Sequence, residues 1–160
     1  MGNTAIMDAG DAVYGSLAEC FITIGKRRYN FMNLTEFESK WDVTISDVKI
    51  LGKVGMGHKP AGGKGTWKGT AHYNQSVLRT MANQYQKTGK LPYFEIQVSN
   101  EDPSSSAGRQ TIIHRGCLCD SFILAKLQAG EEILDEDISG TFESWDMPEK
   151  FKELNGFRTN

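Results

Sequence analysis

Two stretches of this 160-residue chain alternate between side-chain types strictly enough to define its fold class. In residues 35–45, TEFESKWDVTI, the odd positions are mostly apolar and the even positions are all polar. In residues 64–73, KGTWKGTAHY, glycine, alanine and aromatic residues alternate with lysine, threonine and histidine. Successive side chains of a β-strand point to opposite faces, so a period of two predicts strands with one buried face. The chain is therefore predicted to be mainly β, with antiparallel strands.

Other segments complete this architecture. Further strands are predicted at residues 17–24, 91–99, 109–116, 118–128 and 131–145, with a tight hairpin turn at Gly25-Lys26-Arg27. Residues 74–88 break the period, because Val77, Leu78, Met81 and Tyr85 form one helical stripe that Gly89 can end. The polar segment 100–108 predicts a surface loop. We expect one domain of residues 1–160 with two packed antiparallel sheets, as a β-sandwich or barrel, one flanking α-helix and a long inter-strand loop.

The long loop is predicted at residues 46–63, and loops of this length are usually functional or disordered. It carries an apolar cluster beside two basic residues: Val48, Ile50, Leu51, Val54 and Met56, with His58 and Lys59. A single copy of the chain offers no evident surface to cover this cluster. The composition therefore indicates a contact with another subunit.

The glycine-rich segment 55–74, GMGHKPAGGKGTWKGTAHYN, has the composition of a phosphate-binding loop. A Walker A loop needs G-x-x-x-x-G-K-[ST], but the frame that begins at Gly57 places Gly63 at the lysine position. Such loops also need a helix to begin on them, whereas an alternating strand follows here. The favoured interpretation is a loop tip followed by a strand whose glycines allow a bend or a close backbone approach. A small β-barrel domain that binds phosphate or nucleotide through residues 55–66 is the alternative.

Charge and reactive residues indicate no enzyme. The formal net charge is −2, so no general basic field favours nucleic-acid binding. No apolar run could span a membrane, and the first residues do not have the pattern of a signal peptide, so we expect a cytoplasmic product. Cys117 and Cys119 are predicted to lie on one face of a strand and not to bind metal, and Cys20 and the histidines are scattered. The acidic run at 131–137 is predicted to be a solvated strand surface. We expect no catalytic residue, metal or cofactor.

Five short segments together resemble one family. G-H-K at 57–59, G-K-G-T at 63–66 and G-T-A-H-Y-N at 69–74 precede the predicted helix, and K-T-G-K-L-P-Y-F follows it at 87–94. The last segment, T-F-E-S-W-D-M-P-E-K, consists of Thr141, Phe142, Glu143, Ser144, Trp145, Asp146, Met147, Pro148, Glu149 and Lys150. In order and spacing, residues 55–151 resemble the tail-tube proteins of contractile-tailed phages and of phage-like particles of the PBSX type.

This resemblance implies a structural protein of the virion tail, made in the cytoplasm of the host bacterium. Six copies would form a ring, and stacked rings would form a conduit for DNA. The partners implied are further copies of the chain and the tail sheath, tape-measure and baseplate or initiator proteins, with no membrane. An infectious phage and a DNA-free contractile bacteriocin both fit, and a tube protein of the type VI secretion class is a further alternative.

The resemblance also implies roles for particular segments. The 46–63 loop would stack on the adjacent ring, while residues 1–15 would form an N-terminal arm and residues 146–160 a charged C-terminal segment that is helical or loose. Two polar strand faces are candidates to line the lumen: Glu36, Glu38, Lys40 and Asp42 on one strand, and Lys64, Thr66, Lys68 and Thr70 on the next.

Overall fold

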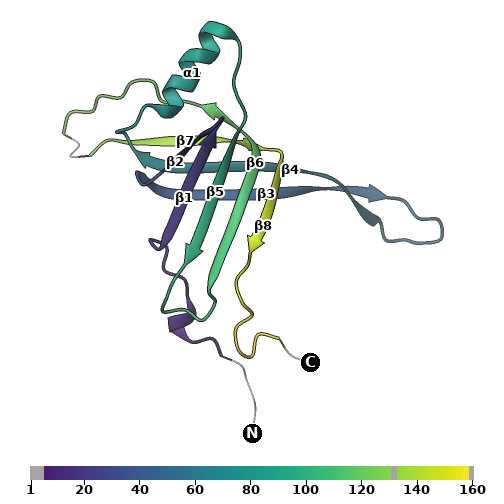
Figure 1. The fold of residues 1–160 in the computed structure, drawn as a ribbon. Helices are drawn as coiled ribbons and strands as arrows, with labels where there is room; N and C mark the ends of the chain where they lie inside the picture. Colours follow the sequence, from purple (N-terminus) through teal and green to yellow (C-terminus); the bar gives the residue numbers. More distant parts are fainter. Residues whose placement is uncertain (1–5, 131–132, 159–160) are drawn as a thin grey trace. The chain divides into compact units, whose positions relative to one another are not determined.

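The computed structural model describes residues 6–130 and 133–158, and its strands and single α-helix are shown in Figure 1. Residues 1–5 of the predicted N-terminal arm and residues 159–160 of the C-terminal segment lie outside the described residues. The chain forms two compact units, the first made of Met1–Met32, Phe94–Arg115 and Trp145–Asn160, the second of Asn33–Tyr93 and Gly116–Ser144. A single domain over 1–160 stays a prediction.

The first unit is an antiparallel sheet built from strands β1 (Ala18–Ile24), β2 (Arg27–Asn30), β5 (Phe94–Glu101), the first part of β6 (Arg109–Ser121) and β8 (Ser144–Glu149). The predicted hairpin turn is confirmed: Ile24 pairs with Arg27 and Gly25 has a φ of 61°. Ile22 and Ile96 are opposite each other in β1 and β5 and are both buried. A short 3₁₀ helix, η1 (Ala9–Asp11), precedes the sheet.

The second unit contains β3 (Leu34–Val48), β4 (Gly57–His72), α1 (Val77–Thr88), the remainder of β6 and β7 (Asp135–Phe142). The predicted helix is confirmed, and its C-cap Gly89 is left-handed with a φ of 73° and donates its N–H to the Tyr85 carbonyl. Leu78 and Met81 of the predicted stripe are buried, but Tyr85 is half exposed, because it lies one turn from the C-terminal end of the helix. The unit's core also holds Trp67, Ala71, Ile138 and Phe142.

Strand pairing confirms the mainly β antiparallel fold and corrects several boundaries. The hydrogen-bonded order is β2-β1-β5-β6-β7-β4-β3, with β8 on β6, and it does not close into a barrel. The strands predicted at 109–116 and 118–128 are one strand, β6, in which Gly116 takes a φ of 68°, and residues 122–128 do not belong to a strand. The strand predicted at 131–145 begins with residues 131–132, which lie outside the described residues. The described part of it holds two strands, β7 and β8, separated at Glu143, so part of the predicted C-terminal segment 146–160 is strand.

The three cysteines are buried and form no disulfide in the described part of the chain. Cys117 and Cys119 both point to the buried side of β6, as predicted. Burial raises the pKa of Cys20 to about 12 and that of Cys119 to about 11, which removes the reactive thiolate. We expect Ellman's reagent to react with the folded protein at pH 8 on the order of 100-fold more slowly than with the unfolded chain. Equal rates before and after unfolding would contradict this burial.

His114 is a buried histidine in the first unit, and its Nδ1–H donates to the Ile96 carbonyl at 2.9 Å. Burial lowers the pKa of His114 below the ordinary 6.5, because the imidazolium loses its hydration. The unfolded chain therefore binds more protons than the folded one as the pH falls through 6.5. We expect the free energy of unfolding to decrease from pH 7.5 to pH 5.5, as followed by urea denaturation. His114→Gln should flatten this dependence, and an unchanged pH slope in that variant would be the contrary result.

Candidate assembly surfaces

The two polar strand faces that the sequence predicts are one face of the β3–β4 hairpin. Cross-strand partners in an antiparallel pair lie on the same side of the sheet. The register pairs Glu36 with Thr70, Glu38 with Lys68, Lys40 with Thr66 and Asp42 with Lys64. We call these eight residues the polar face. Its three carboxylates and three lysines sum to zero formal charge, and two of the lysines stand opposite a carboxylate.

The polar face continues onto β7, which pairs with β4. Thr70 is opposite Asp137 and donates its hydroxyl hydrogen to that carboxylate at 3.0 Å. His72 is opposite Asp135, and its Nδ1 lies 2.8 Å from the Asp135 carboxylate. The acidic run is therefore partly what the sequence predicts, since Asp135 and Asp137 share one partly exposed face.

The opposite face of the same strands is built from glycines covered by aromatic rings. An added Cβ would lie 2.4 Å from the Trp41 ring at Gly63, 2.4 Å from the Phe142 ring at Gly65 and 2.8 Å from the Trp67 ring at Gly140. Side chains would hold these rings away from the backbone, so glycine lets them lie flat on the sheet. This confirms the predicted close backbone approach. It also explains why glycines alternate with bulky residues in the 64–73 stretch.

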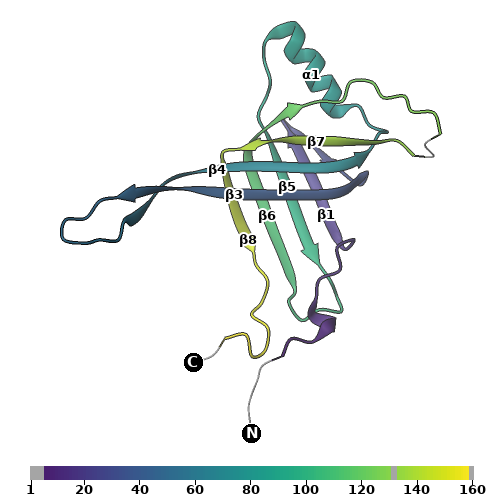
Figure 2. The same cartoon turned by 180° about the vertical axis from the view of Figure 1, so that it is seen from behind.

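The hairpin extends well beyond its neighbour β7. The β4–β7 register ends at Gly65 opposite Phe142, so residues 42–64, which we call the hairpin extension, reach past β7. The extension is the long blue-teal projection of β3 and β4 in Figures 1 and 2. Along its apolar side the exposed fraction rises from 39% at Trp41 to 50% at Val43 and 54% at Ile45. The apolar face of the sheet thus continues outward and becomes increasingly uncovered.

The loop predicted at residues 46–63 is therefore mostly strand, and this prediction is corrected. Val48 still pairs with Gly57, and only residues 49–56 connect the two strands. Residues 46–48 and 57–63 do not alternate regularly between apolar and polar side chains. Their backbone N–H and C=O groups are nevertheless satisfied by cross-strand hydrogen bonds. The ladder continues because β4 accommodates a bulge between the Val43–Gly63 and Ile45–Pro60 pairs, where Gly62 takes a φ of 109°.

The end of the extension exposes apolar side chains beside basic ones. Lys53 donates its N–H to the Ile50 carbonyl, closing a turn in which Gly52 has a φ of 87°. Ile50 folds back over Gly57 and is partly covered. The remaining predicted residues lie as follows: Leu51 and Val54 are fully exposed, Val48 and Met56 are partly exposed, His58 lies 2.9 Å from Asp47, and Lys59 is exposed.

The phosphate-loop alternative does not fit this backbone. Residues 57–60 and 63–66 are strand residues whose partners lie in β3. The following residues continue β4 as far as His72, and α1 begins only at Val77. Consecutive backbone N–H groups are thus alternately turned to the two edges of a strand instead of converging on one anion.

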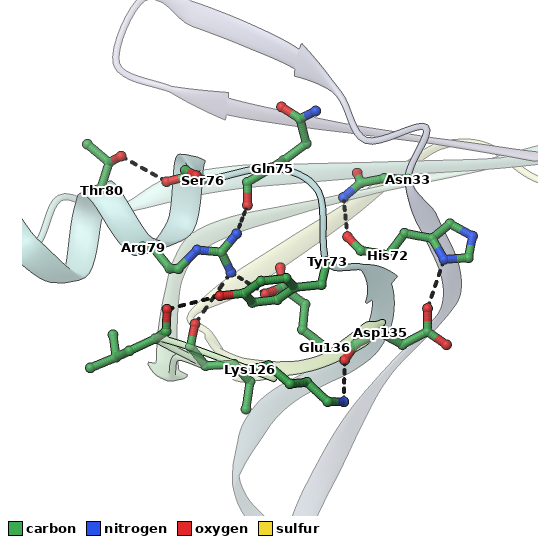
Figure 3. A network of polar contacts seen from close by, with 12 residues as sticks. Asn33, His72, Tyr73, Gln75, Ser76, Arg79, Thr80, Lys126, Asp135 and Glu136 are labelled. Atoms are coloured by element: carbon green, nitrogen blue, oxygen red, sulfur yellow. Dashed lines mark hydrogen bonds and ion pairs between the residues drawn. The ribbon is translucent and has the colours of Figure 1, made fainter. Parts of the chain in front are cut away.

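A polar cluster around Arg79 joins α1 to β7 and to the segment that follows β6 (Figure 3). The guanidinium pairs with the buried Glu136 carboxylate, donates to the carbonyls of Gln75 and Ile123, and lies 4.3 Å from the centroid of the Tyr73 ring. Tyr73 in turn donates its hydroxyl hydrogen to the Leu124 carbonyl at 3.2 Å.

Sequence reasoning missed this cluster. Glu136 was expected to be solvated with the rest of the acidic run, but it is buried beside Arg79. The alternation of side chains along the strand could have revealed it. Alternation places Glu136 on the same face as the buried Ile138, opposite Asp135 and Asp137. A carboxylate on a buried face requires a cation, and Arg79 lies 57 positions away in sequence.

The closing segment at 141–150 is divided between the two units. Thr141 and Phe142 end β7, and Glu143 lies against Gly116 of β6, whose added Cβ would be 2.9 Å from the Glu143 carboxylate. In the first unit, Asp146 pairs with Arg115, and Glu149 accepts from Thr111 at 3.0 Å and lies 3.3 Å from the Arg109 guanidinium. Trp145 and Pro148 are exposed residues of β8, and Lys150 follows it. These contacts hold β8 on β6.

The described residues contain no group of three or more His, Cys, Asp or Glu side chains that could hold a metal ion. Within the same part of the chain, no helix combines the length and apolarity required to cross a membrane.

Known proteins match this chain in sequence and in fold. The chain is 32% identical over 121 residues to the phage-like element PBSX protein XkdM of Bacillus subtilis (strain 168). The aligned region covers 76% of this chain and 82% of that protein. It is also 32% identical over 120 residues to the uncharacterized protein YqbM of the same strain, covering 75% and 82%.

Among solved structures, a chain of the anti-feeding prophage baseplate superposes with a TM-score of 0.62 at 11% identity, covering 92% of this chain and 97% of that one. A chain of the extended sheath–tube complex of the extracellular contractile injection system PVC gives a TM-score of 0.56 at 12% identity, covering 80% and 86%. Both show a shared fold. The sequence match to the family described as phage tail tube protein spans residues 5–149, so this chain belongs to the phage tail tube protein family.

Proposed function

We propose that the protein is the structural subunit of the inner tube of a contractile phage tail or phage-tail-like particle, and that it assembles into stacked hexameric rings that form a conduit for DNA. The observation that carries this proposal is the hairpin extension. Its apolar residues are partly or fully exposed in one copy of the chain, and a cluster of exposed apolar residues marks a protein interface. Val48, Ile50, Leu51, Val54, Met56, His58 and Lys59 would contact the next ring.

The end of the strand order supports lateral assembly within a ring. β3 spans 15 residues and stands at the end of the hydrogen-bonded order, with β4 on its inner side. A long strand edge invites pairing with other chains unless the assembly itself covers it. A closed ring of identical subunits repeats one heterologous contact and leaves no such edge uncovered.

The polar face supports a role as the wall of the lumen. DNA binds a protein mainly through lysines and arginines that displace counterions from phosphates. On the polar face, Lys64 and Lys68 each have a carboxylate directly across the strand pair, and the face has no formal excess of positive charge. Such a wall would let a DNA duplex pass without binding its phosphates tightly. The protein in this role is not an enzyme and needs no cofactor.

In the particle, the tube would meet the tail sheath, the tape-measure protein and the baseplate or initiator proteins, after synthesis in the cytoplasm of the host bacterium. The similar solved chains come from a baseplate and from a sheath–tube complex, which supports partners of this kind.

Electron microscopy of the purified protein tests the proposal. We expect sixfold rings or tubes at high protein concentration or after addition of tail initiator proteins. A species that stays monomeric under all these conditions would refute it. The lumen is tested separately by placing cysteine at Lys40 or Thr66 and labelling assembled tubes: a small maleimide should react, and a maleimide on a particle too large for the lumen should not.

A tube that delivers protein, as in injection systems or a type VI-like machine, is a second candidate. The observation in its favour is that the similar solved chain of the PVC complex belongs to an extracellular contractile injection system. Particles purified from the producing cells and treated with nuclease distinguish the two. Protected DNA supports the phage tail, and its absence from intact particles supports the injection tube.

A further inference from the structure

The segment that follows β6 has an ordered backbone but uncovered apolar side chains. We call residues 122–130 the exposed loop. Arg79 donates to the carbonyl of Ile123 at 3.4 Å and Tyr73 to the carbonyl of Leu124 at 3.2 Å. In the middle of the loop, the Lys126 ammonium group donates to the Asp135 carbonyl at 2.6 Å. Three polar contacts thus anchor residues 123–126, next to Leu127.

The leucines of the exposed loop are largely uncovered by the described part of their own chain. Leu124 is 68% exposed and Leu127 is 97% exposed, and Ile133, just before β7, is 64% exposed. Fixing a backbone while leaving two leucines in water has an entropic cost and no hydrophobic gain within one subunit. The arrangement is that of a surface preorganised to bind something apolar.

The exposed loop lies at the opposite end of the second unit from the tip of the hairpin extension. Asp135, which begins β7 immediately after this segment, pairs with His72 at the end of β4, while the extension lies at the beginning of β4. In Figure 1 the light-green loop is at the left end of β7 and the extension projects to the right. One copy of the chain therefore carries two groups of exposed apolar residues at opposite ends of the second unit.

The two surfaces also carry opposite charges. The tip of the extension has Lys49, Lys53 and Lys59 beside its exposed apolar residues, with Asp47 next to His58. Near the exposed loop, the partly or fully exposed acids are Asp120, Asp135 and Asp137, against Lys126. Complementary charge around an apolar centre selects one partner and one orientation.

We infer that the exposed loop of one copy is the receptor for the tip of the hairpin extension of a second copy, with Leu51 and Val54 packing on Leu124 and Leu127 and lysines facing Asp135 and Asp137. The contact is heterologous, because each copy offers one tip and one receptor, so it propagates from subunit to subunit. This inference rests on the proposed tube assembly and names the surface that receives the extension.

A disulfide experiment tests the contact. The variant Leu51→Cys/Leu127→Cys is assembled and then oxidised, and non-reducing gel electrophoresis is expected to show a ladder of covalent dimers, trimers and longer chains. The native thiols are buried, so they contribute little background. The matched control, Leu51→Cys/Tyr85→Cys, moves the second thiol to a half-exposed position of α1 in the same unit, and we expect at least tenfold less ladder from it.

Tubes visible by microscopy without a ladder would overturn the inference and leave the tube assembly standing. Absence of tubes from the unmodified chain would instead refute the proposed function.

Charge reversal gives a second readout. Lys49→Glu/Lys53→Glu and Asp135→Lys/Asp137→Lys are each expected to lower the sedimentable fraction at least tenfold, since each brings like charges together. All four changes in one chain should restore assembly, because every copy then carries the reversed tip and the reversed receptor. Thermal melts confirm that each variant is folded. Failure of the combined variant to recover, in a folded protein, would contradict the pairing of these two surfaces.

Discussion

Gly140→Ala is expected to destabilise the protein by at least about 3 kcal/mol or to prevent its folding. A Cβ at this position would lie 1.9 Å from the Leu118 carbonyl oxygen and 2.8 Å from the Trp67 ring. The nearest atom belongs to the backbone of β6, so no change of side-chain rotamer relieves the overlap. The β6–β7 pairing, in which Cys119 is opposite Gly140, would have to separate.

Urea denaturation of the unassembled protein measures this effect, and two further glycines provide graded controls. Gly55→Ala meets nothing within 4 Å and should change the free energy of unfolding by no more than about 0.5 kcal/mol. At Gly63→Ala the nearest atoms belong to the Trp41 ring, which is 39% exposed and can move outward, so we expect about 1 kcal/mol. Equal urea midpoints for Gly140→Ala and Gly55→Ala would show that the backbones of β6 and β7 are not as close at Gly140 as described.

Arg79→Leu is expected to cost about 3 kcal/mol, because it leaves the Glu136 carboxylate buried without its cation. The side chains of Arg79 and Glu136 are 17% and 8% exposed, so solvent compensates little for the lost partner. The same change removes the contact with the Tyr73 ring and the hydrogen bond to the Ile123 carbonyl, so the exposed loop should also become more susceptible to proteolysis.

A double-mutant cycle separates the ion pair from the other contacts of Arg79. Arg79→Leu/Glu136→Leu should be more stable than the sum of the two single changes predicts, with a coupling on the order of 2 kcal/mol. The control is Arg115→Leu, which removes a guanidinium that is 46% exposed and paired with Asp146, and we expect about 1 kcal/mol or less. Strict additivity of the Arg79 and Glu136 changes would mean that the pair does not form.

Much of the local structure could be predicted from the sequence. Alternation over residues 35–45 identified β3 and assigned its two faces, since a period of two depends only on backbone geometry. The apolar stripe and Gly89 placed α1 within a few residues. The glycine-rich segments, residues 87–94 and the closing segment together indicated the family, which the match over residues 5–149 confirms.

Long-range pairing could not be predicted in the same way. Alternation identified the polar sides of β3 and β4 separately. Whether these two sides form one face depends on the pairing register of β3 with β4, which includes an irregularity near Gly62. The segment 46–63 resembled a loop because exposed strands of a two-stranded hairpin have no buried face to impose alternation. Glu136 looked solvated because its partner, Arg79, is on a helix distant in sequence.

The sequence by itself determined the mainly β class, the helix α1 and the two faces of the strands around residues 35–45 and 64–73, because these follow from the local geometry of the backbone. Only the tertiary structure decided which faces meet, which glycines lie beneath aromatic rings and which apolar residues remain uncovered. Each of these depends on the pairing of residues far apart in the chain. The glycines of 55–74 show the difference: their composition indicated close packing, and the pairing showed that Gly62 bends a strand while Gly63 and Gly65 lie beneath Trp41 and Phe142.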